Sequence, residues 1–335
     1  FIFTAASQQH GADTYALAQL QKLCDNPAFA GCKIRIMPDV HPGKVGTIGF
    51  TSTLGSSVLP NVIGIDIGCG ITMAKIKGKT KDFARLDTVI QENVPSGFGV
   101  RTNPHHNAAD FDFSELCCRR HIGESKALLS LGTLGGGNHF IETDTDGGPN
   151  TYLTVHTGSR RLGKEITEYY LNAGQKELQK QGAAIPYELT YLTGQLMAEY
   201  LHDLAAAQKF AELNRRIIIS EICKGMKWKI TETFSCVHNY IDFNPPVPII
   251  RKGAIAAAQN QPVIIPVNMR DGIILGKGLG NEEWNCSAPH GAGRIMKRED
   301  VKNNFTVSQF KKAMKGVYSS CVDKDTLDEA PFAYR

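Results

Sequence analysis

The apolar stretch at residues 58–74 (VLPNVIGIDIGCGITMA) constrains the fold more than any other part of the chain. It is rich in β-branched residues and is interrupted by glycines, which predicts two buried strands joined by a glycine turn. That turn carries Asp66 and Cys69. A buried carboxylate requires a partner, and an aspartate beside a cysteine suits a borderline-soft metal ion. The alternative is that Cys69 is a small buried hydrophobe, the more frequent role of a lone cysteine.

Three histidines share the local setting of Asp66 and Cys69, at the edge of an apolar strand beside glycine or another turn residue. His139 follows three glycines, and His156 and His238 each end an apolar strand. One such histidine alone is more often a satisfied core residue. Five residues of metal-binding type in the same setting favour a site for Mn, Fe, Co or Zn, in which a thiolate can bridge two ions.

The glycine-rich loop around His139 and the turn after His156 both suit an anion. Residues 132–142 read GTLGGGNHFIE, and three consecutive glycines let a ligand approach the backbone. The motif fits neither GxGxxG nor a Walker loop, so a wide hairpin turn is the alternative. His156 is followed by TGSRRLG, which places hydroxyls and arginines beside a candidate metal ligand before a helix that should begin near Gly163.

A histidine among small and cationic residues stands near the C-terminal end. Residues 286–298 read CSAPHGAGRIMKR, in which His290 precedes Gly291, Ala292 and Gly293. Cations favour a phosphate-bearing partner, and a histidine held among them is a phosphate contact or a nucleophile toward phosphorus. A glycine turn that opens a basic helix is an equal alternative for this segment alone. A metal site beside it would favour phosphoryl or nucleotidyl transfer.

Two weaker signals involve histidines in polar turns. His41 lies two residues after Asp39 and could form a proton-handling pair with it, but a turn aspartate and a surface histidine are the favoured interpretation. His105 and His106 occupy a polar loop and receive no assignment.

Composition bounds the class of protein. With 335 residues, 42% hydrophobic and 21% charged, the chain matches an ordinary soluble globular protein. A net charge of +4 does not by itself indicate a nucleic-acid binder, so any basic patch must be local. Nine scattered cysteines without a CxxC pair argue for a reducing, cytoplasmic compartment. No apolar run reaches membrane-spanning length, and the ends at Phe1 and Arg335 lead us to expect that both termini are incomplete.

Periodicity predicts mixed helices and strands. Helices are expected at 13–23, 81–94, 112–129 and 309–318, and two or three more at 189–219 within a helical region, 164–224, where no chemistry is expected. Strands are expected at 33–37, 140–143, 228–242, 255–258 and 262–269, with a basic turn at 251–254 and a glycine-rich connection at 270–280.

The order of these elements favours a single α+β domain over residues 1–335. No internal repeat and no βαβ periodicity is present, which argues against a doubly wound sheet. We expect mixed, largely antiparallel sheets with peripheral helices around a central metal and nucleotide cleft, and a helical insertion at about 164–225.

Taken together, these motifs resemble those of the RtcB family of RNA-splicing ligases. The combination of GGGNHF with HGAGR is highly specific, and the matches keep one order across residues 37–334. The matching stretches are MPDVHPGK (37–44), IGIDIGCG (63–70), SLGTLGGGNHFIE (130–142), VHTGSRRLG (155–163), VHNYID (237–242), RKGA (251–254), SAPHGAGRIMKR (287–298) and DEAPFAY (328–334).

The resemblance implies a ligase dependent on GTP and manganese that acts in RNA repair or tRNA splicing. It would join an RNA 2′,3′-cyclic phosphate or 3′-phosphate end to a 5′-hydroxyl end. In the family the motif histidine, here His290, attacks the α-phosphate of GTP, the guanylyl group passes to the RNA 3′-phosphate, and the 5′-hydroxyl displaces GMP. Imidazole suits this relay because it attacks when neutral and leaves readily once protonated. The resemblance leaves open whether an activating partner such as archease is needed.

Site residues follow from the resemblance by position. Asp66, Cys69 and His139 would hold one Mn²⁺, and Cys69, His156 and His238 the other, with the thiolate shared. Asn138 would contact the GTP phosphates, Phe140 would stack near guanine, and Glu142 would accept from its N–H edge. Gly291 to Gly293 would lie along the ribose, and Tyr334 would line the base pocket. Further implied nucleotide contacts are His139, Ile141, His238, Asn239, Pro266, Val267, Asn268, Met269 and His290. The implied RNA or phosphate contacts are Arg160, Arg294 and Arg298.

The chain departs from the family pattern in its nucleotide loop. The family commonly has PGSMG followed by a further serine, whereas residues 266–271 read PVNMRD. The family's C-terminal lysine that contacts guanine has no counterpart in this chain, and Arg161 replaces a usual glycine. These differences indicate a divergent subgroup whose nucleotide selectivity is open. They also leave two other classes open, a metal-dependent RNA cyclic-phosphate phosphoesterase and a non-ligating protein that binds RNA ends.

Overall fold

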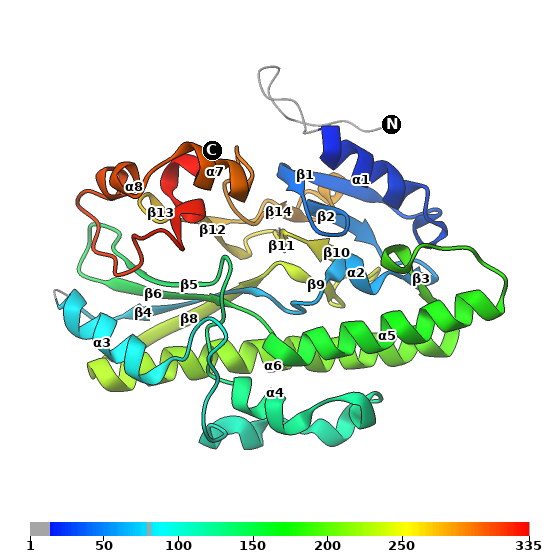
Figure 1. The fold of residues 1–335 in the computed structure, drawn as a ribbon, viewed down its shortest axis with the longest axis horizontal. Helices are drawn as coiled ribbons and strands as arrows, with labels where there is room; N and C mark the ends of the chain where they lie inside the picture. The colour runs from blue at the N-terminus through cyan, green and yellow to red at the C-terminus, as the bar shows by residue number, and fades with distance from the viewer. Residues whose placement is uncertain (1–13, 79–81, 335) are drawn as a thin grey trace.

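Two four-stranded antiparallel sheets and a pair of long helices form the framework of the protein (Figure 1). The computed structural model describes residues 14–78 and 82–334. Asp13 and Lys81, expected as the first residues of two helices, lie outside the described residues. The mixed α+β class and the antiparallel character of the sheets are confirmed.

The first sheet has the strand order β5-β6-β4-β8. Its strands are β4 (Gly70–Ile76), β5 (Phe140–Asp144), β6 (Thr151–Thr157) and β8 (Ile230–Val237). Successive side chains of a strand point to opposite faces. Ile71 and Met73 therefore join a cluster with β11 and β12, while Ala74 and Ile76 join a cluster with α3 and α6. Because both faces of β4 are buried, its sequence is apolar almost throughout.

The second sheet has the order β1-β2-β10-β9. Its strands are β1 (Ile34–Pro42), β2 (Thr47–Thr53), β9 (Asn239–Asp242) and β10 (Ile249–Lys252). The register of β1 against β2 shifts between Ile36 and His41. Only His238 separates β8 of the first sheet from β9 of the second, so this residue lies where the two sheets meet.

Three two-stranded pairs complete the β structure of the described residues. They are β3 (Ser57–Val58) with β7 (Leu192–Thr193), β11 (Ala254–Ala256) with β14 (Ser287–Pro289), and β12 (Pro262–Asn268) with β13 (Gly272–Lys277). The β11–β14 pair ends at Pro289, which places His290 directly beyond it.

Helices lie on both sides of the β structure (Figure 1). They are α1 (Thr14–Cys24), α2 (Pro60–Ile63), α3 (Phe83–Asn93), α4 (Glu124–Ser130), α5 (Arg160–Lys180), α6 (Gly194–Met226), α7 (Arg298–Asn304) and α8 (Val307–Ala313). Short 3₁₀ helices occur at Pro27–Phe29, His106–Asp110, Phe113–Glu115, Arg119–His121, Tyr187–Leu189, Glu282–Trp284, Leu327–Glu329 and Pro331–Ala333. No helix in the part of the chain that the structure describes is both long enough and apolar enough to span a membrane.

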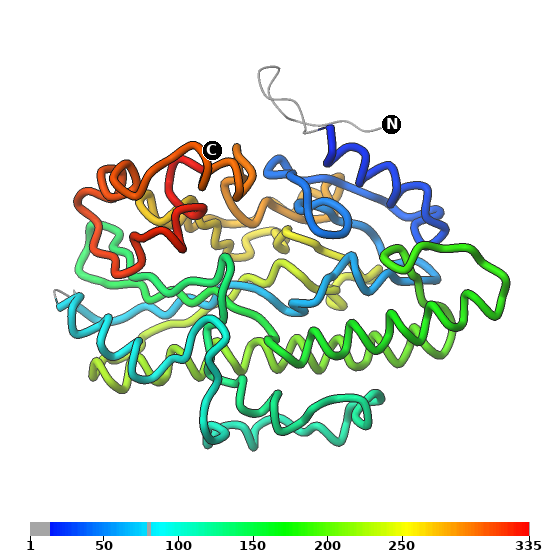
Figure 2. The backbone as a smooth tube through the Cα atoms, viewed as in Figure 1, coloured from blue at the N-terminus to red at the C-terminus, as the bar shows by residue number. Residues whose placement is uncertain are grey.

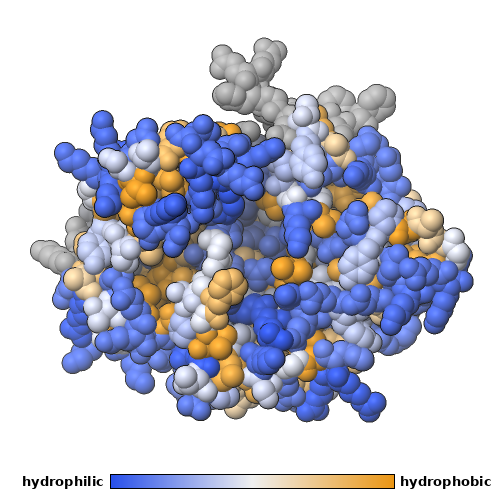
Figure 3. Space-filling view, in the orientation of Figure 1, coloured by the Kyte–Doolittle hydropathy of each residue, from blue (hydrophilic) through white to orange (hydrophobic). Residues whose placement is uncertain are grey.

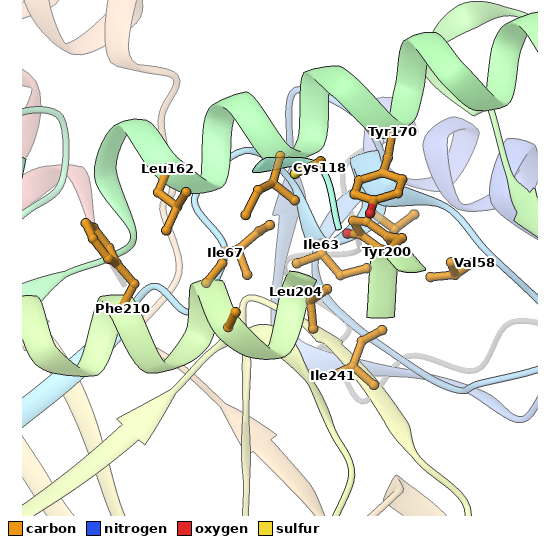
Figure 4. Close-up of a cluster of buried hydrophobic side chains, with 14 of the residues drawn as sticks. Val58, Ile63, Ile67, Cys118, Leu162, Tyr170, Tyr200, Leu204, Phe210 and Ile241 are labelled. Carbon is orange, nitrogen blue, oxygen red and sulfur yellow. The ribbon is translucent and has the colours of Figure 1, made fainter. Parts of the chain in front are cut away.

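The largest core cluster joins α5 and α6 to the edge of the second sheet. Figure 4 shows Tyr170 of α5 and Tyr200 of α6 with their rings beside each other, near Ile63 and Leu204, and the two ring centroids are 5.3 Å apart. Full burial of aromatic and aliphatic side chains on this scale is the main favourable contribution to folding. The α5–α6 pair is therefore a fixed base for the loops above it.

Several predicted elements differ in the structure. The stretch at 112–129 is not one helix. Asp112 caps a short 3₁₀ helix, and Gly123 is the N-cap residue of a separate helix, α4. Pro60 starts the short helix α2 where a strand was expected, since proline fits the first turn of a helix. Residues 194–219 belong to one α-helix, α6. Three of the polar residues that seemed to interrupt it, Asp203, Asn214 and Arg215, are buried and hydrogen-bonded, and others lie on its exposed side.

The remaining differences concern strand and helix ends. Residues 251–252 belong to β10 rather than to a basic turn, and the glycine-rich connection contains β13. His238 divides the predicted 228–242 strand into β8 and β9, and β1 extends past the predicted 33–37 strand to Pro42. The helix after His156 begins at Arg160, before Gly163. The last helix begins earlier than predicted, because Thr306 and Gln309 form a capping box, and it ends at Ala313.

The C-terminal segment returns to the middle of the molecule. Figure 2 shows the red end of the chain running beside the orange segment that precedes α7. The backbone N–H of Ile295 donates to Ala333, and Arg294 and Tyr334 form an isolated antiparallel bridge. This return brings DEAPFAY next to HGAGR although they are far apart in sequence.

Candidate functional site

One end of the first sheet gathers the predicted metal ligands. Cys69 immediately precedes β4, and His139 immediately precedes β5. The register pairs His156 of β6 with Ile71 and with Phe140, and pairs Val237 at the end of β8 with Gly70. In an antiparallel sheet the starts of two strands and the ends of their neighbours meet at one edge. The ladder thus brings together side chains that the sequence could not pair.

Five side chains converge there as two sets that share Cys69. Cys69 Sγ lies 3.5 Å from His139 Nε2 and 3.4 Å from His156 Nε2. His139 Nε2 is 2.9 Å from Asp66 Oδ2, and His156 Nε2 is 3.3 Å from His238 Nε2. In each set the ligand atoms lie within 4.8 Å of one another. Thiolate, imidazole and carboxylate donors with these separations could hold two ions bridged by the sulfur.

The glycine-rich loop fixes which nitrogen of two histidines faces this centre. His139 Nδ1 is 2.8 Å from the carbonyl oxygen of Leu134, and His156 Nδ1 is 2.9 Å from that of Asn138. A carbonyl can only accept, so each Nδ1 carries the proton and donates it. In the neutral rings this leaves the lone pair on Nε2, which is the tautomer a metal ligand needs. Without an ion, His139 Nε2 can instead donate a proton to Asp66 Oδ2, 2.9 Å away.

The protonation states at the centre also suit cation binding. Burial lowers the pKa of His156 to about 3 and that of His238 well below its ordinary value, so both imidazoles are neutral. Burial would raise the pKa of Asp66, but the hydrogen bond and charge of His139 hold it well below its usual range. Burial, reinforced by Asp66, raises the pKa of the Cys69 thiol. A bound metal ion would deprotonate such a thiol outright.

Two glycines are required by close approaches at this centre. A Cβ on Gly158 would lie 2.2 Å from Asp66 Oδ1, and one on Gly135 would lie 2.1 Å from the guanidinium of Arg160. Gly135 also has a φ of 83°, which favours glycine. Arg160 thereby fits beneath the glycine loop, with Nη1 3.4 Å from His139 Nδ1. Of the predicted phosphate contacts, Arg160 is the one that touches a candidate metal ligand.

Helix α6 supports the centre through two buried residues that sequence reasoning missed. Asn214 Oδ1 accepts from the backbone N–H of Gly132 at 2.7 Å, and its amide donates to Gly158 O at 3.2 Å. Arg215 donates from Nη1 to Gly68 O at 2.7 Å and to Thr157 O at 2.9 Å. Both are fully buried. The expectation that 164–224 carries no link to chemistry was incomplete, and the polar pair inside an apolar helical pattern was the available signal.

His290 lies beside the centre and is bound to Asp39. Asp39 Oδ2 is 2.7 Å from His290 Nδ1 and accepts from the His290 backbone N–H at 3.1 Å. The carboxylate fixes the proton on Nδ1, so Nε2 carries the lone pair. The ring of His290 is 4.9 Å from that of His238, and its side chain is 17% exposed. A partly accessible imidazole nitrogen with a free lone pair can act as a nucleophile.

The favoured interpretation of Asp39 and His41 as turn and surface residues was wrong. Asp39 is 3% exposed and lies in the irregular part of β1. His41 Nδ1 contacts the carbonyl oxygen of Asp39 at 2.8 Å, and burial lowers the pKa of His41. Asp39 therefore positions His290 rather than forming a proton-handling pair with His41. Only the fold brings residues 39 and 290 together, so their pairing could not be predicted from the sequence.

The predicted nucleotide residues lie on β5 and on the segments that face it. Phe140 packs against the buried cluster that includes Val263 and Ile264 of β12, and Ile265 and Ile273 of the β12–β13 hairpin pack against the same cluster. Gly291 lies against the same hairpin, since a Cβ there would be 3.6 Å from Pro266 O. Figure 3 shows this face of the molecule hollowed at its centre below a hydrophilic rim. The side chain of Asn138 is exposed.

Glu142 has a buried oxygen that lacks a partner. Its Oε1 has no hydrogen-bond partner among the described residues, and the same holds for Asp144 Oδ2, two positions along the same face of β5. Burial, and then the neighbouring Asp144, raise the pKa of Glu142 well above its ordinary value. An unpaired buried carboxyl oxygen is costly, and the N–H groups of a purine base are one kind of ligand that would satisfy it.

Other predicted contacts are occupied within the protein. Asn239 Oδ1 accepts from the backbone N–H of Gly253. Asn268 closes the β12–β13 turn: its Oδ1 accepts from the backbone N–H groups of Arg270 and Asp271, and its amide donates to the Asp271 carboxylate. Their proposed nucleotide contacts stay predictions.

Arg294, Arg298 and Tyr334 form a network with the C-terminal acidic residues. Arg294 lies over the Tyr334 ring at 5.0 Å and donates to its hydroxyl at 3.1 Å. Arg298 pairs with Asp328 and Glu329. The two guanidinium groups are therefore already neutralised by carboxylates or bound to the C-terminal segment. Their role toward RNA stays a prediction, and in this structure they anchor residues 328–334.

The fold and site together define an α+β protein with a candidate two-ion centre beside an aspartate-bound histidine. The model of one protein family, described as "tRNA-splicing ligase RtcB", matches residues 19–121 and 115–335. The chain belongs to the RtcB family.

Individual relatives agree with the family match. The chain is 33% identical over 343 residues to RNA-splicing ligase RtcB of Escherichia coli (strain K12), an alignment covering 90% of this chain and 83% of that protein. It is 28% identical to RNA-splicing ligase RtcB2 of another Escherichia coli strain, an alignment covering 100% of this chain and 88% of that protein. It is 26% identical to tRNA-splicing ligase RtcB of Aeropyrum pernix, covering 90% and 81%.

Proposed function

We propose that this protein is an RNA ligase that joins an RNA 3′-phosphate or 2′,3′-cyclic phosphate end to a 5′-hydroxyl end. It would use GTP as the co-substrate, manganese as the metal and His290 as the residue that carries the guanylyl group. The observation that carries the proposal is the placement of His290. Asp39 Oδ2 lies 2.7 Å from its Nδ1, so in the neutral ring Nε2 carries the lone pair, and its ring lies 4.9 Å from that of His238 of the candidate metal centre.

The proposed reaction has three displacement steps. His290 Nε2 attacks the α-phosphorus of GTP, a P–N bond forms, and pyrophosphate leaves. An oxygen of the RNA 3′-phosphate then attacks that phosphorus and the imidazole leaves. Finally the 5′-hydroxyl oxygen attacks the RNA phosphorus, GMP leaves, and a phosphodiester remains. A 2′,3′-cyclic phosphate end first takes up one water to become the 3′-phosphate.

Asp39 would assist both steps at His290. A carboxylate on Nδ1 stabilises the positive charge that the ring acquires when Nε2 bonds to phosphorus. It also keeps the ring oriented when the guanylyl group departs. Burial of Asp39 strengthens this electrostatic contribution, because the surroundings have a low dielectric constant.

The donor set fits the proposed metal. Asp66, Cys69 and His139 would hold one ion and Cys69, His156 and His238 the other, with the ligand atoms of each set within 4.8 Å of one another. Manganese at such a centre would supply a Lewis acid toward phosphate oxygens. Arg160 beside His139 adds a fixed positive charge for an incoming phosphate.

The nucleotide would lie between β5 and the loop after His290. Phe140 offers an aromatic face, and Glu142 offers the unpaired buried oxygen described above. Pro266, which lies against Gly291, forms the neighbouring wall. The 266–271 segment, which differs from the family pattern, lies at this wall and would influence which base is accepted.

A ligation assay tests the proposal. The substrates are an RNA with a 3′-phosphate or a 2′,3′-cyclic phosphate end and a labelled RNA with a 5′-hydroxyl, incubated with Mn²⁺ and GTP. We expect a joined product with the wild type and none with His290→Ala. Hydrolysis of the cyclic phosphate to a 3′-phosphate without joining of the two RNAs would instead indicate a metal-dependent phosphoesterase. Retention of phosphate-ended RNA with neither product would indicate an RNA-end-binding protein, and either result would overturn the proposal.

A further inference from the structure

A second group of metal-ligating side chains lies apart from the central site, between the 3₁₀-rich segment before α4 and helix α6. Cys117 Sγ is 3.8 Å from His202 Nδ1, and that nitrogen is 3.2 Å from Asp203 Oδ1. The three ligand atoms lie within 4.8 Å of one another. None of the three residues takes part in the proposed ligase chemistry.

These separations match those of a tetrahedral zinc site. With Zn–S near about 2.3 Å and Zn–N and Zn–O near about 2.0–2.1 Å, tetrahedral angles place S and N about 3.6 Å apart and N and O about 3.3 Å apart. The observed distances are 3.8 Å and 3.2 Å. The central site has similar values, with 3.4 Å between Cys69 Sγ and His156 Nε2. The second group is therefore arranged as well for an ion as the first.

Asp203 is held in place before any ion binds. It is fully buried and accepts from the backbone N–H groups of Cys117 at 2.8 Å and Cys118 at 2.9 Å, and from the Tyr170 hydroxyl at 2.8 Å. Figure 4 shows Cys118 near Tyr170 among the buried side chains of the core. Preorganisation of one ligand lowers the entropy cost of forming a metal site. The same contacts fix Cys117 next to His202.

A catalytic Cys–His–Asp relay is a poorer explanation of this geometry. Such a relay uses one ring nitrogen for the thiol and the other for the carboxylate. Here Cys117 and Asp203 both face Nδ1 of His202. A sulfur and an oxygen that both lie close to one ring nitrogen could share a cation with it once that nitrogen is unprotonated.

We infer that Cys117, His202 and Asp203 form a zinc site that ties the segment before α4 to helix α6. Thiolate, imidazole and carboxylate are all zinc donors, and the separations fit a tetrahedral Zn²⁺ site, so Zn²⁺ is the ion that we assign to this group. Cys117 and His202 are exposed, so a fourth position is open to water or to Glu199, which is one turn before Asp203 on the same helix. The site is independent of the ligase proposal, since it shares no residue with the central site.

Cobalt in a Cys69→Ala protein gives a selective test. Removal of Cys69 takes the thiolate out of the central site, so any sulfur-to-cobalt charge-transfer band must come from another cysteine. We expect the full-length Cys69→Ala protein to show such a band with Co²⁺. Addition of Cys117→Ser should abolish it, whereas Cys321→Ser, at an exposed cysteine in the C-terminal segment, should leave it unchanged. A band that is absent from Cys69→Ala, or that survives Cys117→Ser, would overturn the inference.

Zinc stoichiometry gives a second measurement that does not need the Cys69 variant. After equilibration with buffered Zn²⁺, Cys117→Ser should hold one zinc fewer per chain than the wild type. His202→Gln should weaken binding at this site by at least about 10-fold, the lower end of what even the outer partners of a metal ligand contribute. Circular dichroism checks that both variants are folded. Equal zinc content in folded Cys117→Ser and wild-type protein contradicts the site.

Discussion

At the scale of single residues, the proposed chemistry depends on which atoms of His290 and Cys69 are available. Asp39 leaves Nε2 of His290 as the free nitrogen, and the carbonyl groups of the 134–138 loop do the same for two metal-site histidines. Cys69 belongs to both candidate ligand sets. Substitutions at these positions should therefore separate orientation of the nucleophile from metal binding.

Asp39→Asn should slow guanylylation without removing the metal. An amide can keep the contact with His290 but cannot enforce the Nδ1–H tautomer or stabilise the developing positive charge, so adduct formation should slow by roughly 100-fold or more. Metal analysis should show unchanged Mn²⁺ content. Asp146→Asn, at an exposed turn aspartate, is the control. A full rate in Asp39→Asn would show that the aspartate does not position His290.

Metal content should depend on which ligand is removed. Cys69→Ala deletes the shared sulfur and should lose both ions, whereas His238→Gln and Asp66→Asn should each lose one, because each belongs to one set only. Elemental analysis of Mn²⁺ per chain after equilibrium dialysis gives the result. The shared-thiolate assignment is wrong if Cys69→Ala retains the wild-type content.

At the scale of elements, helix α6 and the turns above it fix the geometry of the centre. Arg215 binds the carbonyl oxygens of Gly68 and Thr157, and Asn214 binds the glycine-rich loop. A buried cation without a paired carboxylate is costly unless its N–H groups are all used. The helix thus couples the turn before β4, the end of β6 and the loop before β5.

Arg215→Met should weaken both folding and metal binding. It leaves buried carbonyl groups without donors, at about 1–3 kcal/mol for an unsatisfied group, so the free energy of unfolding should fall by roughly that amount or more. Mn²⁺ affinity should fall with it because the Gly68 and Thr157 turns lose their support. The neighbouring Arg216→Met is a matched control, since Arg216 is exposed. Equal denaturant midpoints for the two variants would contradict the role assigned to Arg215.

Gly158→Ala should displace Asp66. The added methyl group would lie 2.2 Å from Asp66 Oδ1, so either the carboxylate or the turn must move. We expect loss of the ion that Asp66 would hold, together with retention of the fold. Gly123→Ala, whose nearest contact would be an ordinary 3.4 Å, should have the wild-type metal content. Normal metal content in Gly158→Ala would mean that Asp66 is not a required ligand.

At the scale of the whole molecule, the sequence predicted the candidate metal ligands that the fold brings together, but not the residues that support them. Asp66, Cys69, His139, His156 and His238 were recognisable because each lies at the edge of an apolar strand beside a turn. Their pairing was not predictable, because His156 and His238 are 82 residues apart and meet only through the strand register. Asn214 and Arg215 were missed because they bind mainly distant backbone groups, and the partner of Asp39, His290, is 251 residues away in the sequence.

The fold class was predictable from the local sequence pattern. The division of the strands between two sheets and the length of α6 were not. Alternating apolar residues and glycine turns indicate antiparallel strands wherever they occur. The division of the strands between two sheets depends on His238, where a single residue separates β8 from β9. The length of α6 depends on buried hydrogen bonds that make its polar positions compatible with a core helix.

Covalent guanylylation of His290 is the claim on which the proposed function rests. The most direct measurement is the intact mass of the protein after incubation with GTP and Mn²⁺, followed by peptide mapping under conditions that preserve a P–N bond. We expect the mass to increase by one guanylyl group located on His290. The increase should be absent from His290→Ala and should require Mn²⁺. An unmodified mass for the metal-loaded wild type, or a GMP group on another residue, would contradict it.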